Sequence, residues 1–167
     1  MVHEFLLPST FWRLVSSLLQ RQGLLRSAGP GRGLRVLDEL GSLRDPLAAS
    51  VLEAVPEVAP RCGLAPFEPV GVDMRVLSRA NDYLEPTHDA TVDDRALGFV
   101  LFLHREPRTF EGGSLHLHTS TNESVIEPSQ NSMIFFRSSI AARVGAVFPA
   151  SSALVDSHHT LEGCIRR

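Results

Sequence analysis

Residues 95–117 read RALGFVLFLHREPRTFEGGSLHL, and this stretch decides the fold. An apolar run over 97–103 ends before a Glu-Pro pair, and an alternating run over 114–118 begins after a Gly-Gly pair. Short apolar or alternating runs that are separated by turn residues are typical of β-strands. The two-residue period also occurs over 70–77, and a further short apolar run covers 133–136. The second half of the chain is therefore predicted to consist of short strands.

The first third of the chain has a helical period instead. Apolar residues recur three and four positions apart over 9–19, and a similar pattern covers 45–55. The four prolines between 56 and 69 are then expected to break the chain into a loop. Two helices followed by many short strands predict an α+β fold, in which the helices pack on one side of a double-sheet barrel.

This architecture predicts which side chains are buried. Trp12 and Leu18 of the first helix are expected to cover an outer face of the sheets. The strand residues expected to lie between or beneath the two packed sheets are Phe99, Leu101, Leu103, Leu115, Leu117, Ile134 and Phe136.

Length and composition indicate one folded domain. The chain has 167 residues, of which 43% are hydrophobic and 21% charged, so a disordered protein is excluded. We expect a single domain over 1–167, with mainly helical support over 1–66 and the barrel core over 67–167. A formal net charge of −3 argues against nucleic acid as the main partner.

Cysteine usage and the N-terminal sequence bear on localisation. Cys62 and Cys164 form no CxxC pair, which predicts two reduced thiols. The first residues lack the basic and long apolar segments of a signal peptide, and no apolar run has the length of a membrane span. The expectation is a soluble cytoplasmic protein without a membrane partner; the sequence does not indicate the oligomeric state.

Histidine and carboxylate residues near strand ends suggest a metal site. His88 and Asp89 precede the strand at 95, and a second histidine pair, His158 and His159, lies far along the chain. Two histidines and one carboxylate can bind iron on one face and leave positions open for oxygen and a co-substrate. A double-sheet barrel brings distant strand ends together, so these residues are candidate ligands.

Four motifs in this region are similar to those of a known family. They are THD at 87–89, LHREP at 103–107, FEGGSL at 110–115 and EPSQNSMIFF at 127–136. Over about 74–136 the chain resembles the prolyl 4-hydroxylase-like branch of the 2-oxoglutarate/Fe(II) oxygenases. The resemblance implies a double-stranded β-helix (jelly roll), Fe(II), 2-oxoglutarate as co-substrate and O2. It also implies hydroxylation of an unactivated C–H bond in an amino-acid, peptidyl or related small substrate.

The resemblance also implies roles for individual residues. Iron is expected to bind His88, Asp89 and His159, with His158 as the alternative distal ligand. The far carboxylate of 2-oxoglutarate is expected to pair with Arg167, or else Arg166, because a planar guanidinium matches a carboxylate.

The metal motif departs from the family's His-x-Asp, and this leaves two alternatives open. Thr87 stands at the usual histidine position, and neighbouring residues on a strand point to opposite faces, so His88 and Asp89 converge only at a bulge or turn. A His88-x-Ala90 interpretation resembles the related halogenases, in which chloride binds beside a small residue together with His88 and His159. The displaced histidine and the short C-terminus instead favour a non-catalytic or truncated jelly-roll binding module.

Two further sets of histidines are predicted to lie outside the iron site. His116 and His118 share one face of a strand and can themselves bind a metal, although a solvated or substrate-facing stripe is the preferred interpretation. His104 is expected to form a structural hydrogen bond.

Overall fold

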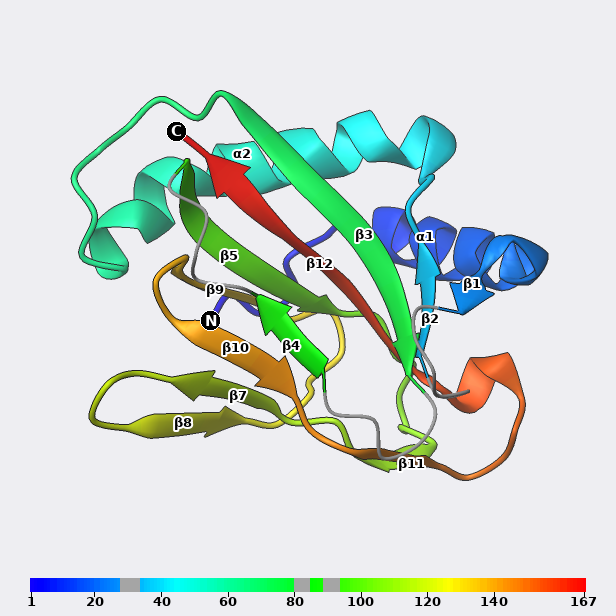
Figure 1. The fold of residues 1–167 in the computed structure, drawn as a ribbon. Helices are drawn as coiled ribbons and strands as arrows, with labels where there is room; N and C mark the ends of the chain where they lie inside the picture. Colours follow the sequence, from blue (N-terminus) through cyan, green and yellow to red (C-terminus); the bar gives the residue numbers. More distant parts are fainter. Residues whose placement is uncertain (28–33, 80–84, 89–93) are drawn as a thin grey trace.

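The computed structural model describes residues 1–27, 34–79, 85–88 and 94–167, and it has two α-helices and twelve strands within these ranges (Figure 1). The helices are α1 (Pro8–Gln20) and α2 (Arg44–Arg61), with single 3-10 turns at η1 (Gln22–Leu24), η2 (Gly41–Leu43) and η3 (Leu154–Asp156). The first six strands are β1 (Arg26–Ser27), β2 (Leu34–Leu37), β3 (Gly71–Arg79), β4 (Glu85–His88), β5 (Arg95–Phe102) and β6 (Phe110–Gly112). The others are β7 (Leu115–His118), β8 (Glu123–Ile126), β9 (Met133–Arg137), β10 (Ala141–Val144), β11 (Val147–Pro149) and β12 (His158–Arg166).

The strands form two main antiparallel sheets. The large sheet has the order β1-β2-β3-β12-β5-β9, the small sheet has the order β4-β10-β7-β8, and β11 pairs with β6. The last strand in the sequence, β12, therefore lies in the middle of the large sheet, between β3 and β5 (Figure 1).

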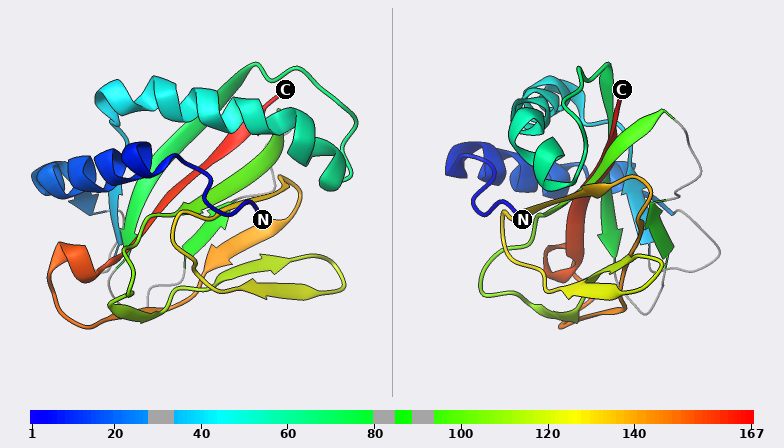
Figure 2. Two further views of the ribbon diagram at one scale, coloured as in Figure 1. Left: turned by 180° about the vertical axis from the view of Figure 1, so that it is seen from behind. Right: turned by 90° about the vertical axis from the view of Figure 1, so that its left-hand side faces the viewer.

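Three layers result from this arrangement. Both helices pack on one face of the large sheet, and the small sheet lies across its other face (Figure 2). One hydrophobic core joins the helices to the large sheet, and a second joins β5 and β9 to β7 and β10. The α+β class and the double-sheet arrangement with helices on one side agree with the sequence prediction. In the described part of the chain, no helix is long and apolar enough to span a membrane.

The strand patterns were reliable predictors of the core. Phe99, Leu101, Leu103, Leu115, Ile134 and Phe136 are all buried, and Leu117 is partly buried. The prediction for Leu18 is confirmed, since it is 1% exposed. Cys62 and Cys164 are free thiols.

The prediction for Trp12 is wrong, because its side chain is 47% exposed. The buried face of α1 is formed by Phe11, Leu14, Val15 and Leu18. Each residue turns the helix by about 100°, so the position after Phe11 points away from that face. Trp12 packs edge-on against the ring of Phe11, with centroids 5.2 Å apart.

The prediction that prolines end the second helix near residue 55 is also wrong. Helix α2 continues through Pro56 and Pro60 to Arg61. An internal proline costs a helical hydrogen bond. Here Val58 and Ala59 lie in the core beneath the large sheet, and their burial favours continuing the helix.

Candidate functional site

The alternation of side chains along β12 divides it between the two cores. Leu161 packs among the helix-facing residues of the first core. Thr160 and Glu162 have the opposite orientation, because they stand directly opposite Phe102 and Val100 of β5, which belong to the core between the sheets. A polar pair therefore faces the space between the two sheets.

Arg79 of β3 completes a buried polar cluster on this face. Its Nη1 lies 2.7 Å from Oε1 of Glu162 and donates a hydrogen bond of 2.8 Å to Oγ1 of Thr160. The Arg79 and Glu162 side chains are only 3% and 2% exposed. Among the described residues, Nη2 of Arg79 and Oε2 of Glu162 have no hydrogen-bond partner. Within the described part of the chain, these two polar atoms are therefore unsatisfied buried groups.

His158 lies beside this cluster, since it pairs directly with Arg79 across the β3–β12 ladder. It is fully buried, with aromatic neighbours Phe102 and Phe110 at centroid distances of 5.8 and 4.9 Å. Burial, followed by the charge of Arg79, holds the pKa of His158 well below its usual value. The ring is therefore neutral at pH 7, and neither nitrogen has a hydrogen-bond partner in the described part of the chain.

The Gly-Gly pair that the sequence places in a turn covers this histidine. A Cβ on Gly113 would lie 2.9 Å from Cδ2 of His158, and Gly113 has a φ of +77°. Only glycine tolerates both the close approach and this backbone conformation. The motif therefore closes the inter-sheet space over His158, and His104 adds a second imidazole edge-on to Phe110 at 5.3 Å.

His104 forms the structural hydrogen bond that the sequence predicts. Its Nε2 lies 3.2 Å from Oε1 of Glu106, and the ring is 4% exposed. Burial lowers the pKa of His104, an effect that the hydrogen bond to Glu106 opposes.

His159 points to the other face of β12, the side occupied by Leu161. Its Nε2 donates a hydrogen bond of 2.7 Å to the carbonyl oxygen of Leu154. Burial lowers the pKa of His159 to about 4. The two neighbouring histidines thus have different surroundings, and of the two only His158 faces Arg79 and Glu162.

The low pKa of His159 predicts acid sensitivity. An unfolded histidine has a pKa of about 6.5, so between pH 6.5 and about 4 the unfolded chain holds a proton that the folded chain lacks. His159 therefore costs no stability above pH 6.5. As the pH drops below this value, the residue lowers the free energy of unfolding by up to about 1.4 kcal/mol per pH unit. We expect His159→Gln to have a shallower loss of unfolding free energy over this range, measured by urea denaturation at several pH values. If the dependence of the unfolding free energy on pH is the same in the variant and the parent, the low pKa of His159 is not the cause of the acid sensitivity.

The strand that pairs with β4 carries no histidine. His88 stands opposite Ala142 of β10, and the other residues of β10 are Ala141, Arg143 and Val144. For His88, the structure describes the backbone, as the last residue of β4. Asp89 and Ala90 lie outside the described residues, so the carboxylate ligand and the halogenase interpretation both stay predictions.

Arg166 and Arg167 lie at the opposite end of β12 from His158. Nε of Arg166 is 3.2 Å from Oδ2 of Asp73, and the backbone N–H of Arg167 donates to the carbonyl of Asp94. At about 3.3 Å per residue, His158 and Arg166 are separated by about 26 Å along the strand. The structure therefore does not bring either arginine to the histidine, whereas Arg79 is its direct neighbour. Sequence reasoning missed Arg79, because a single arginine at a strand end has no distinguishing pattern.

Comparisons with known proteins place this chain in a family. The sequence model of the 2OG-Fe(II) oxygenase superfamily matches residues 74–162. A PKHD-type hydroxylase of Synechocystis is 28% identical over 132 residues, which cover 70% of this chain and 43% of that protein. The chain thus spans less than half the length of this relative.

Solved structures agree at the level of the fold. A prolyl-4-hydroxylase from Pseudomonas putida has a TM-score of 0.74 at 17% identity, covering 99% of this chain and 90% of that one. A Trichoplax adhaerens prolyl hydroxylase, solved with a peptide of hypoxia inducible factor, has a TM-score of 0.72 at 14% identity, covering 99% and 81%. HygX from Streptomyces hygroscopicus, solved with nickel and 2-oxoglutarate, has a TM-score of 0.62 at 13% identity, again covering 99% and 81%.

With more than half of its residues matched by the family model, the chain belongs to the 2OG-Fe(II) oxygenase superfamily, a family of enzymes, and its resemblances lie with the prolyl 4-hydroxylase-like branch.

Proposed function

We propose that this chain is an Fe(II)- and 2-oxoglutarate-dependent dioxygenase that hydroxylates an unactivated C–H bond of an amino-acid, peptidyl or related small substrate. The observation that carries the proposal is the buried pair of His158 and Arg79 between the sheets, each with unpartnered nitrogen atoms among the described residues. We further propose that residues 67–167 form a double-stranded β-helix core, which residues 1–66 support.

The donor chemistry of His158 fits iron. A neutral imidazole with a free nitrogen is a good ligand for Fe(II), and His158 combines full burial with a depressed pKa. The ring of His159 faces the helices and donates to Leu154, which supports His158 as the distal ligand in its place. His88 and Asp89 are the proposed partners that complete two nitrogens and one carboxylate.

The donor chemistry of Arg79 fits a carboxylate. Its Nη2 is unpartnered among the described residues, and a guanidinium binds a carboxylate through parallel N–H groups. We therefore assign to Arg79 the role that the sequence suggested for Arg167 or Arg166. Glu162 already neutralises Arg79, so a bound 2-oxoacid must compete with Glu162 for the guanidinium.

If bound, iron and 2-oxoglutarate would activate O2 and so supply the oxidant, whereas the protein would position the reactants and exclude water. Phe102, Phe110 and the Gly-Gly turn surround His158 and exclude water from it. A peptidyl substrate is supported by the Trichoplax enzyme, whose structure contains a peptide.

The alternative is a non-catalytic binding module, which the comparisons do not favour, since the matched family consists of enzymes. Its structural basis would be the ion pair between Arg79 and Glu162, which satisfies part of the polar interior without any ligand. Ala142, which pairs with His88, offers no imidazole either.

Anaerobic binding separates the two functions. Adding Fe(II) and 2-oxoglutarate to the purified chain should give the weak visible charge-transfer band of an iron–2-oxoacid chelate. His158→Ala should abolish the band, and Arg79→Gln should raise the 2-oxoglutarate concentration that it requires by 10-fold or more. His159→Ala is the matched control and should keep the band. A folded parent chain without any band would exclude the oxygenase and leave the binding module.

A further inference from the structure

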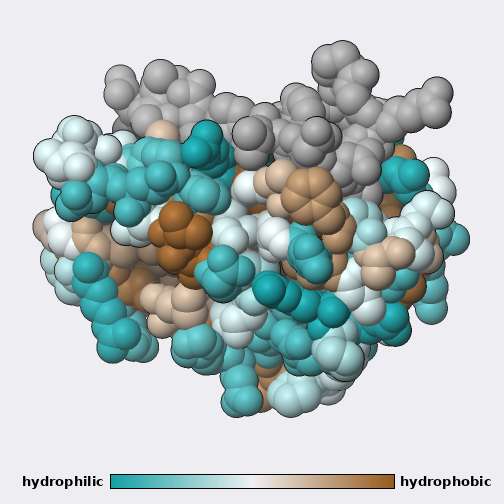
Figure 3. Space-filling model, turned by 90° about the horizontal axis from the view of Figure 1, so that it is seen from below, coloured by the Kyte–Doolittle hydropathy of each residue, from teal (hydrophilic) through white to brown (hydrophobic). Residues whose placement is uncertain are grey.

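The β7–β8 hairpin presents a histidine pair on its outer face. Leu115 and Leu117 of β7 pack into the core between the sheets, so the alternate residues His116 and His118 point outward. Their rings stack with an interplanar angle of 13° and a centroid distance of 6.3 Å. This pair therefore lies outside the inter-sheet space of the proposed iron site. Seen from below, the described surface of the molecule has hydrophilic and hydrophobic side chains interspersed (Figure 3).

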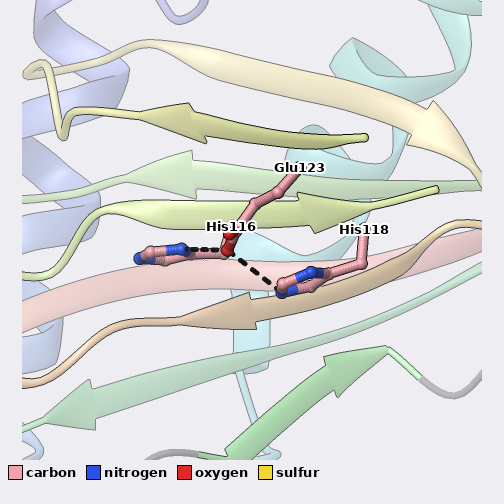
Figure 4. A group of neighbouring side chains, drawn as sticks. All are labelled: His116, His118 and Glu123. Atoms are coloured by element: carbon pink, nitrogen blue, oxygen red, sulfur yellow. Dashed lines mark hydrogen bonds and ion pairs between the residues drawn. The ribbon is translucent and has the colours of Figure 1, made fainter. Parts of the chain in front are cut away.

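Glu123 of β8 joins the two histidines. It pairs directly with His118 across the hairpin, and its Oε1 lies 2.7 Å from Nδ1 of His116 and 3.4 Å from Nε2 of His118. In Figure 4 the carboxylate lies between the two rings, and all three groups converge. One ligand atom from each residue lies within 4.8 Å of the other two.

These separations suit a tetrahedral metal ion. Zinc binds imidazole nitrogen at about 2.0–2.1 Å and carboxylate oxygen at about 2.0–2.2 Å, which places neighbouring ligand atoms about 3.3 Å apart. The observed contacts of 2.7 and 3.4 Å lie on either side of that value. Small rotations of these partly exposed side chains would bring the three atoms onto one ion, since His116, His118 and Glu123 are 24%, 35% and 42% exposed.

We propose that His116, His118 and Glu123 form a second metal site, which binds a divalent cation of the zinc class and keeps its fourth position open to water. Two imidazoles and one carboxylate select such an ion over Mg²⁺ or Ca²⁺, which need mostly oxygen ligands. The site goes beyond the proposed oxygenase function, because it lies on the outer face of the small sheet and shares no residue with the inter-sheet cluster.

Arg143 tunes this site. It stands opposite His116 on β10, and its Nη2 is 3.6 Å from Oε1 of Glu123. Oε1 of Glu123 lies within 2.7 Å of Nδ1 of His116 as well, so this oxygen is shared between the histidine and the guanidinium. A metal ion on Glu123 must then share the carboxylate with a guanidinium and is repelled by its charge. Removing Arg143 should therefore tighten metal binding.

Zinc titration of the metal-free chain tests the site. We expect His158→Ala, which removes the proposed iron ligand, to retain one tight zinc equivalent. His118→Ala and Glu123→Gln should each weaken this binding by 10-fold or more, and Arg143→Gln should strengthen it several-fold. His3→Ala, which alters an exposed histidine elsewhere, should leave it unchanged. Co²⁺ bound at the site should also give the visible absorption of a tetrahedral ion.

The results that overturn the proposal are distinct from those that test the iron site. If His118→Ala, Glu123→Gln and His3→Ala all bind zinc like the parent, the hairpin is not a metal site. Circular dichroism would check that each variant is folded, and we expect folding to persist because His118 and Glu123 are partly exposed. If the parent chain binds zinc at the hairpin but gives no iron–2-oxoglutarate band, only the oxygenase proposal is overturned. If it gives the band but binds no zinc at the hairpin, only the hairpin site is overturned.

Discussion

We expect Arg79→Met to lower the free energy of unfolding by about 3–5 kcal/mol, because it leaves Glu162 buried without its charge partner. Methionine fills a similar volume, so the loss comes from the unpaired carboxylate more than from a cavity. The other oxygen of Glu162 already lacks a partner in the described part of the chain. Urea denaturation at pH 7 measures the effect.

A double variant identifies the cause. Arg79→Met with Glu162→Leu removes both charges and should recover most of the lost stability, since replacing a buried ion pair by apolar residues is often neutral. The ion pair of Arg61 with Glu57 is the exposed control, with 67% and 66% of the side chains accessible. Arg61→Met should cost no more than about 0.5 kcal/mol. Equal losses in the single and double variants would refute the charge argument.

We expect Gly163→Ala to cost about 3 kcal/mol or more, or to prevent folding altogether. A Cβ at this position of β12 would lie 2.0 Å from the carbonyl oxygen of Asp73 and 2.7 Å from Cζ of Phe99. Neither atom can easily move, because Asp73 belongs to the paired strand and Phe99 to the core. The overlap therefore separates β12 from a neighbouring strand.

Thermal unfolding compares this variant with a matched glycine. Gly23 has no atom within 4 Å of an added Cβ, so Gly23→Ala should change stability by no more than about 1 kcal/mol. If both substitutions have the same small effect, then β12 does not pack as tightly against β3 and β5 as the structure indicates.

The sequence predicted the strands well because the two-residue period and the buried face have the same cause. Phe99 and Leu101 are buried because alternate positions of β5 face the helices, and residues such as Phe102 face the small sheet. The residues at which helices end were harder to predict from the sequence. Pro56 has a local preference against helix, but the core contacts of Val58 and Ala59, which are formed only in the complete fold, override it.

The site was harder to predict, because a shift of one residue along a strand moves a side chain to the other face. His158 and His159 are equivalent in the sequence, and only the pairing of β12 with β3 and β5 determines that His158 faces the polar cluster. The role of Arg79 depends on the same pairing. His88 and Asp89 stay predictions, since the ligand geometry they require lies outside the described residues.

The central place of β12 also constrains the order of folding. Strands β3 and β5 are close in the sequence, yet they hydrogen-bond to opposite edges of β12, which is made later than both. The large sheet has a high contact order and cannot close on a ribosome-bound chain until β12 has emerged. Until then the unpaired edges of β3 and β5 are open to other chains, so slow synthesis through this region should increase aggregation and dependence on chaperones.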